Sequence, residues 1–136
     1  MSEINLEAKI ENIETAQALL HEQIDKFDCS FGVVMQLEIA IEEIFTNISN
    51  YAYGENTGMA LVKIETTDDP ACVYITFTDG GTPYNPLEKE DPDITLGIED
   101  RPIGGLGIFM VKETMDDMIY EYKDGKNVLT IKKLLK

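Results

Sequence analysis

The sequence predicts an α+β fold, a two-layer sandwich with a mixed, mostly antiparallel sheet and three main helices on one face. Two long segments carry apolar residues at helical spacing, and a cluster of glycines opens a third, shorter helix. Short segments at both ends and in the middle of the chain alternate apolar and polar residues as strands do. With 136 residues, the chain has the size of one domain, so we expect residues 1–136 to form a single domain.

The first elements are a short strand and an amphipathic helix. Residues 4–8 alternate as an edge strand does, and residues 11–27 have an apolar stripe at helical spacing. Such a stripe usually faces the protein's own core, although a seam for a binding partner has the same pattern. The stripe consists of Ile13, Ala16, Leu20, Ile24 and Phe27.

The second helix is predicted to be longer and to begin after Ser30, a residue type that caps helix N-termini. We expect it to end near Tyr53 and Gly54. Its apolar residues are Leu37, Ala40, Ile41, Ile44, Phe45, Ile48 and Tyr51.

Two antiparallel strands follow, at residues 60–66 and 73–77, and Asp68, Asp69 and Pro70 are expected to form the turn between them. The segment 80–105 then has no sustained periodicity and is rich in proline and charge. Because a loop of this length inside a domain is usually functional or disordered, we interpret residues 84–104 as a lid. A helix at 106–115 and two strands at 118–122 and 128–134 complete the chain.

Composition excludes several classes of protein. A formal net charge of −15 opposes binding to nucleic acid and to anionic membranes. No apolar segment approaches the roughly 20 residues that span a bilayer, and the acidic N-terminus does not resemble a secretory signal, so we expect a cytoplasmic protein. The only histidine and the two cysteines, Cys29 and Cys72, have no metal-ligand spacing.

Glu43 and Asn47 are separated by four positions and therefore project from the same side of the second helix, beside its apolar stripe. A carboxylate and a carboxamide placed there suit the activation of an oxygen nucleophile and the completion of a Mg²⁺ shell. The same spacing also fits a solvated polar edge, which is the more common case.

Two glycine-rich segments suit a nucleotide. Asp79, Gly80 and Gly81 end a strand where a ligand can approach the backbone closely, and Asp79 can accept a hydrogen bond from an exocyclic amine. Gly104, Gly105, Leu106 and Gly107 open a helix whose free N–H groups suit a phosphate, and Arg101 is the nearest positive charge. Alone, the first segment also fits an ordinary turn, the second a linker, and Arg101 a solvated surface residue.

The order of these elements resembles the Bergerat-fold superfamily of ATP-binding domains, which includes gyrase, MutL and histidine kinases. The run 43–47 with the tyrosines that follow it resembles the N-box of that superfamily, residues 79–86 resemble its first glycine box, and residues 105–107 its second. The likeness covers nearly the whole chain. It is greatest to the small serine kinases that act as anti-sigma factors in bacterial partner switching.

The resemblance implies that ATP and Mg²⁺ are the cofactors. Position by position, Glu43 is the general base, Asn47 holds Mg²⁺, and Asp79 contacts the adenine amino group. Gly81 lets adenine approach, Gly105 and Gly107 hold phosphates under the lid, and Thr130 supports the adenine end.

The family also implies partners: a sigma factor, a small antagonist protein that is phosphorylated on serine, and a second copy of the chain. Two departures from the family bear on the partners. Tyr51 stands where the family often has histidine, and the first helix has no arginine. We therefore weigh a Mg-ATP-dependent serine/threonine kinase against a nucleotide-gated binding module that transfers no phosphate, with a stand-alone histidine kinase domain as the third possibility.

Overall fold

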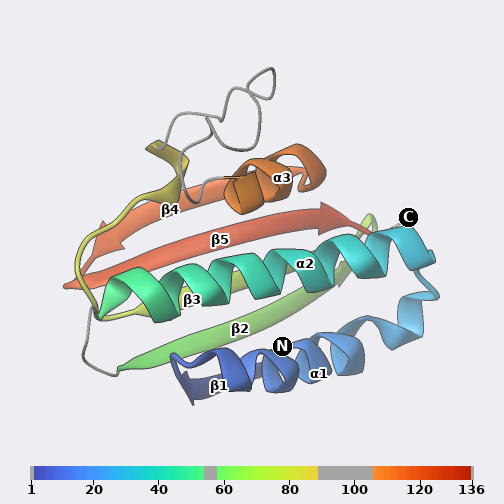
Figure 1. Cartoon of the computed structure of the whole chain (residues 1–136). Coiled ribbons are helices and arrows are strands. Elements are labelled where there is room, and N and C mark those ends of the chain that lie inside the picture. The colour runs from blue at the N-terminus through green and yellow to red at the C-terminus, as the bar shows by residue number, and fades with distance from the viewer. Residues whose placement is uncertain (1, 54–57, 89–105, 136) are drawn as a thin grey trace.

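The computed structural model describes residues 2–53, 58–88 and 106–135, and these residues form one five-stranded sheet with helices packed on it (Figure 1). The strands are β1 (Ser2–Glu7), β2 (Met59–Asp68), β3 (Ala71–Asp79), β4 (Asp117–Lys123) and β5 (Lys126–Leu134). Their order across the sheet is β1-β2-β3-β5-β4, and each neighbouring pair is antiparallel. The described sheet is therefore purely antiparallel, where the sequence suggested a mixed one.

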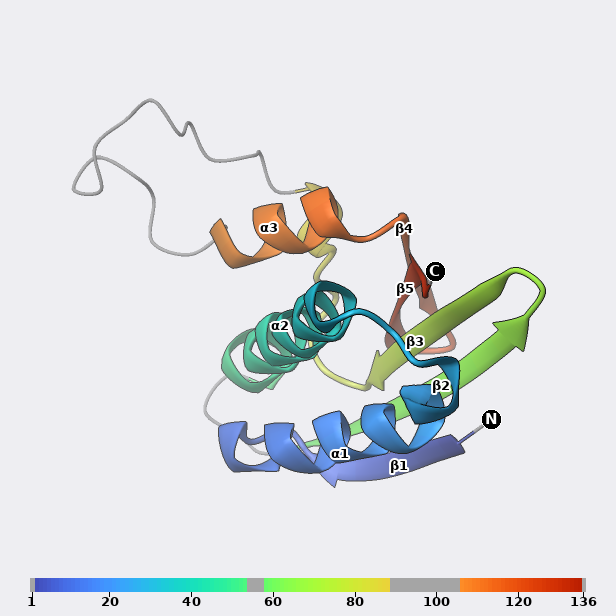
Figure 2. The ribbon, with the colours of Figure 1, turned by 90° about the vertical axis from the view of Figure 1, so that its right-hand side faces the viewer.

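Three helices cover one face of this sheet: α1 (Ile13–Ile24), α2 (Phe31–Asn47) and α3 (Leu106–Thr114). Figure 2 shows them side by side on the same side of the strands. The predicted α+β two-layer sandwich is confirmed. All five residues of the first helix's apolar stripe are buried in the core between the layers, so the stripe belongs to the protein's own interior.

The helix boundaries follow local chemistry. The Ser30 hydroxyl accepts a hydrogen bond from the Val33 N–H at 3.3 Å, which is the N-cap contact that the sequence predicted for α2. Helix α1 is shorter than predicted, because single 3₁₀ turns, Ile10–Asn12 and Asp25–Phe27, flank it. At its other end α2 continues into a π-helical turn, Ile48–Ala52. None of the described helices combines the length and apolar character needed to cross a membrane.

The central strands bring two polar residues to the helix-covered face. Successive side chains on a strand alternate between faces, so Phe77 and Asp79 of β3 share one face, as do Asn127 and Leu129 of β5. Asp79 and Asn127 are cross-strand partners in the β3–β5 register. Each is only 6% exposed, and they are the two buried polar side chains of the described core. Buried polar side chains need hydrogen-bond partners, and the partners of Asp79 and Asn127 lie around the candidate site described next.

Candidate functional site

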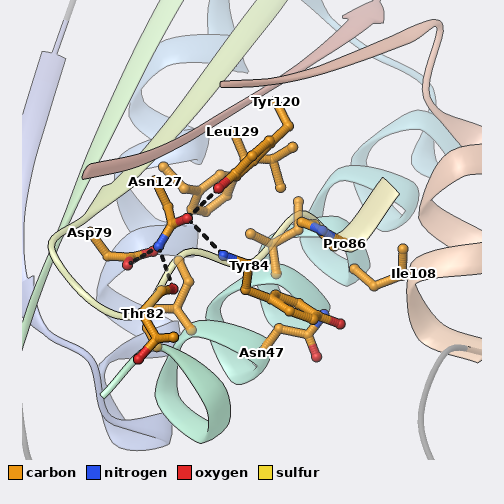
Figure 3. Close-up of a pocket in the computed structure, with 13 residues that line it drawn as sticks. Asn47, Asp79, Thr82, Tyr84, Pro86, Ile108, Tyr120, Asn127 and Leu129 are labelled. Carbon is orange, nitrogen blue, oxygen red and sulfur yellow. Dashed lines mark hydrogen bonds between the residues drawn. The ribbon is translucent and has the colours of Figure 1, made fainter. Parts of the chain in front are cut away.

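A pocket lies between the helix layer and the sheet, at the end of β3 (Figure 3). It contains about 430 Å³ of space that no atom fills, including the part open to solvent. In Figure 3 Asp79 stands at one end and Ile108 of α3 at the other, with Asn47 of α2 between them. The lining is mostly apolar and comprises Ile44, Asn47, Ile48, Ala52, Phe77, Asp79, Thr82, Tyr84, Pro86, Ile108, Tyr120, Asn127 and Leu129.

Asp79 presents a hydrogen-bond acceptor to this pocket. Its Oδ1 accepts from the Gly81 N–H at 3.0 Å and from the Asn127 Nδ2 at 2.9 Å. Over the described residues, Oδ2 has no hydrogen bond, although the side chain is buried. Because an ionised carboxylate can only accept, this oxygen suits a ligand group that donates. The structure therefore places Asp79 at the wall of a cavity.

Gly81 lies against the backbone of the π-helical turn that ends α2. A Cβ built at this position is 2.1 Å from the Ala52 carbonyl oxygen, closer than any ordinary contact. The next residue holds the two backbone segments together, because the Thr82 N–H donates to the Ala52 carbonyl at 2.6 Å. The sequence suggested that glycine here lets a ligand approach. The described structure gives a different reason, since glycine lets the loop after β3 pack on the end of the α2 segment.

Replacing Gly81 with alanine should therefore destabilise the fold. The new methyl group has to push apart two backbone segments, which costs about 1–3 kcal/mol in the free energy of unfolding. Urea denaturation followed by circular dichroism measures this directly. Gly32→Ala is the matched control, because a Cβ there meets nothing within 4 Å and lies inside helix α2, where alanine is favoured. Equal midpoints for wild type and Gly81→Ala would contradict the packing argument.

Asn47 and Glu43 extend the site along α2. Asn47 lines the pocket, and Glu43 lies one turn earlier, where its carboxylate is next to the first turn of α3. A Cβ built at Gly107 is 1.9 Å from Glu43 Oε2, so only glycine leaves room for the carboxylate in this position. Partial burial, and then the negative charge of Glu42, raise the pKa of the Glu43 carboxyl above its ordinary value.

The start of α3 is the other end of the site. The helix begins at Leu106, so its first backbone N–H groups have no partner within the helix and its N-terminal end carries partial positive charge. Glu43 and Gly107, which the sequence placed in two different motifs, come together here. The remaining predicted residues of this end, Arg101, Gly104 and Gly105, and most of the predicted lid lie outside the described residues.

Thr130 does not line the pocket. Its hydroxyl makes a hydrogen bond of 3.1 Å with the Thr76 hydroxyl, its cross-strand partner on β3. Strand alternation puts both threonines on the face opposite to that of Leu129, which lines the pocket. Thr130 therefore joins two strands at the uncovered side of the sheet and is not part of the site we describe.

Asn127 is the site residue that the sequence analysis missed. Its Nδ2 donates to Asp79 and, at 2.9 Å, to the Thr82 carbonyl, while its Oδ1 accepts from the Tyr84 N–H at 3.0 Å and from the Tyr120 hydroxyl. A weak signal was present, since Asn127 is the polar member of an otherwise apolar alternation with Leu129 and Ile131. Dashed lines in Figure 3 mark these contacts.

One tyrosine of the pocket wall, Tyr84, contacts a second tyrosine, Tyr51. Tyr84 contributes its ring to the lining, and this ring lies 5.7 Å from the ring of Tyr51, centroid to centroid, at a tilt of 32°. Tyr51 follows the N-box-like run, and Tyr84 is the first residue of the predicted lid. The contact therefore joins the end of the α2 segment to the beginning of the lid segment.

Curated bacterial proteins are similar to this chain over most of its length. A serine-protein kinase RsbW of Bacillus cereus is 24% identical over 132 residues, which cover 96% of this chain and 82% of the relative. A serine-protein kinase RsbW of Bacillus mycoides is 27% identical over 134 residues, with the same coverage.

Solved structures share the fold at lower identity. The RsbU and RsbW domains of a Mycobacterium tuberculosis protein match with a TM-score of 0.62 and 14% identity, over 99% of this chain and 33% of that one. The catalytic domain of the histidine kinase ThkA matches with a TM-score of 0.52 and 17% identity, over 99% and 98% of the two chains. The profile of the histidine kinase-like ATPase domain matches residues 6–133. Because this match covers nearly the whole chain, the chain belongs to the histidine kinase-like ATPase domain family.

Proposed function

We propose that this protein binds ATP with Mg²⁺ and transfers phosphate to a serine or threonine of a small partner protein. The observation that carries the proposal is the arrangement of one pocket. A buried acceptor, Asp79, stands at one end, and a carboxylate, Glu43, stands beside the N-terminus of α3 near the other. Asn47 lies between them. The similarity to serine-protein kinases supports the same reaction.

The pocket suits an adenine base. Apolar side chains from α2 and the sheet, among them Ile44, Phe77 and Leu129, form walls for a flat ring. Asp79 Oδ2 accepts a hydrogen bond from the 6-amino group, which is the donor that distinguishes adenine from guanine at this position. The base would lie at this end, with the phosphates directed toward α3.

The end of the pocket near α3 offers a small number of groups that can neutralise the negative charge of the phosphates. The free N–H groups at the start of α3 can bind phosphate oxygens, and the Asn47 carboxamide oxygen is a ligand type that Mg²⁺ accepts. We extend this end with Gly105 and Arg101, on the family resemblance. Because the whole chain carries a formal net charge of −15, Mg²⁺ is expected to be needed for tight binding.

Glu43 is the residue we assign to proton transfer. ATP supplies the phosphoryl group, and the chemistry left to the protein is mainly positioning and charge neutralisation. The Glu43 carboxylate takes the hydroxyl proton of the substrate serine at Oε1 or Oε2. The pKa of the Glu43 carboxyl is raised and is therefore closer to the operating pH, which favours general base catalysis.

The partners we propose follow the family. The substrate is an antagonist-like small protein, the second partner is a sigma factor, and the protein acts as a cytoplasmic homodimer. The test is to mix the purified protein, Mg-ATP labelled in the γ-phosphate, and the antagonist-like domain proteins of its own genome. Appearance of phosphoserine or phosphothreonine in one of them, found by mass spectrometry, supports the proposal. If ATP binds but no such protein is labelled, the transfer step is refuted.

The contact between Tyr51 and Tyr84 favours a second candidate, a nucleotide-gated binding module. The contact ties the first residue of the proposed lid to the end of the α2 segment, so nucleotide in the pocket can change the surface that a partner meets. In that case ATP should alter partner affinity in a pull-down assay without phosphorylation. The same labelling experiment therefore separates the two candidates.

A further inference from the structure

We infer that Asn127 is a positioning residue that sets the base selectivity of the pocket, by fixing the direction in which the Asp79 carboxylate presents an oxygen to a ligand. The inference rests on the proposed nucleotide function. Asn127 itself is cross-strand from Asp79 and lies in the same pocket wall. The residue is 6% exposed, and its carboxamide makes four hydrogen bonds, two as donor and two as acceptor.

The backbone fixes the orientation of this carboxamide. The Tyr84 N–H can only donate, so the group that faces it at 3.0 Å has to be the Asn127 oxygen. The Thr82 carbonyl can only accept, so the group that faces it at 2.9 Å has to be the Asn127 nitrogen. Flipping the amide would break both contacts. The same nitrogen also faces Asp79, and it can only donate there.

One oxygen of the Asp79 carboxylate is already occupied by hydrogen bonds within the protein. Two donors, Asn127 Nδ2 and the Gly81 N–H, both contact Oδ1. A partial rotation of the carboxylate would pull this oxygen away from two buried donors, which is costly, and a full flip only exchanges two equivalent oxygens. The two donors therefore fix the direction of the group. Oδ2 therefore remains as the acceptor for a ligand. A base with an amine at this position gains a hydrogen bond, and a base with a carbonyl meets another acceptor.

The selectivity of the pocket is tested with two ligands, ATP and inosine triphosphate (ITP), whose bases differ by an amine and a carbonyl at one ring carbon. We expect the wild-type protein to bind ATP about 100-fold more tightly than ITP, as buried polar sites discriminate in general. Calorimetric titration gives both dissociation constants. Absence of ATP binding to the wild type would overturn the proposed function and this inference with it.

Asn127→Ser removes the Nδ2 donor to Asp79 and leaves a shorter side chain whose hydroxyl is free to rotate, with space for a water molecule. If Asn127 fixes Asp79, the ratio of the two affinities should fall roughly tenfold, because Asp79 can then turn. The control is Thr76→Val, which also removes a side-chain hydrogen bond between β3 and β5, but on the face away from the pocket. The control should keep the wild-type ratio. If ATP binds the wild type selectively and Asn127→Ser weakens both ligands equally, Asn127 is only structural and the inference fails.

Asn127→Asp adds a signature that loss of structure cannot imitate. In this variant a carboxylate replaces the Asn127 carboxamide, whose nitrogen is 2.9 Å from Asp79 Oδ1. Two carboxylates at such a short distance share one proton. The ratio of ATP to ITP affinity should then depend on pH in this variant, because the proton that the pair takes up at acidic pH can occupy the Asp79 oxygen that faces the ligand and donate from there to a carbonyl. A ratio in Asn127→Asp that is as large and as constant with pH as in wild type would contradict the inference.

A measurement on the wild type keeps the inference testable if neither variant folds. The side-chain NH₂ of Asn127 should give an exchange-protected signal in a ¹⁵N spectrum, because it is buried and hydrogen bonded. We expect this signal to shift when ATP is added and to stay in place with inorganic triphosphate, which has no base. A signal that does not respond to ATP at saturating concentration would overturn the coupling.

Discussion

Asp79→Asn should weaken ATP binding by about 100-fold, or about 2.8 kcal/mol, while the protein stays folded. The variant is isosteric, so packing is kept. The two donors that contact Oδ1 in the wild type, Gly81 N–H and Asn127 Nδ2, will select the oxygen of the new carboxamide. The new NH₂ group then faces the pocket and meets the amine of adenine, donor against donor. Calorimetric titration of Mg-ATP into both proteins measures the loss.

A second ligand separates this effect from general damage to the pocket. Because the new NH₂ can donate to a carbonyl, Asp79→Asn should bind ITP at least as tightly as the wild type does. Thermal melting by circular dichroism should show a similar midpoint for both proteins. If the variant binds ATP with wild-type affinity, Asp79 does not contact the base, and the proposed orientation of the nucleotide is refuted.

Glu43→Gln should lower the rate of phosphate transfer by about 10³-fold, which is within the range for loss of a general base. ATP affinity should change by less than roughly twofold, because Glu43 lies beside the first turn of α3 and is not among the residues that line the pocket. Single-turnover assays with labelled ATP and the partner protein give the rate. Unreduced transfer in Glu43→Gln would exclude the base role.

The pH dependence of phosphate transfer gives a second test of Glu43, and a variant of the neighbouring residue, Glu42, serves as its control. Only the deprotonated Glu43 carboxylate can accept a proton, so the rate should rise with pH, with a midpoint above the ordinary pKa of glutamate because burial and Glu42 raise the pKa of Glu43. Glu42→Gln removes one of the two causes and should move the midpoint to lower pH without abolishing transfer. A midpoint that Glu42→Gln leaves unchanged would assign the titration to another group.

Local chemistry explains the parts of the fold that the sequence predicted well. Helix α2 and its Ser30 cap depend on residues within one or two turns of each other, so periodicity and a capping residue suffice to predict them. The end of β3 at Asp79 also follows from a local pattern, in which alternation stops at an acid and two glycines. The boundaries of α1 and the purely antiparallel sheet depend on packing across the whole domain, and they were predicted less well.

The residues of the site that escaped prediction depend on strand register. Asn127 matters because it is the cross-strand partner of Asp79, a relation between residues far apart in sequence that no single segment encodes. Thr130 was expected at the adenine end from the family resemblance. Its position on the strand has the opposite parity to Asn127, so its side chain is on the other face of the sheet. Gly81 was predicted because glycine lets a ligand approach the backbone, whereas the structure shows that glycine is needed for close packing against Ala52.

The tyrosines around the pocket give the protein an intrinsic optical reporter. The chain has six tyrosines and no tryptophan, so its ultraviolet fluorescence comes from tyrosine alone. Tyr84 and Tyr120 line the pocket, the ring of Tyr51 contacts that of Tyr84, and the Tyr53 hydroxyl accepts a hydrogen bond from the Gly80 N–H. A stacked purine should quench this emission. Occupancy of the pocket can therefore be followed in stopped-flow time courses of the unlabelled protein.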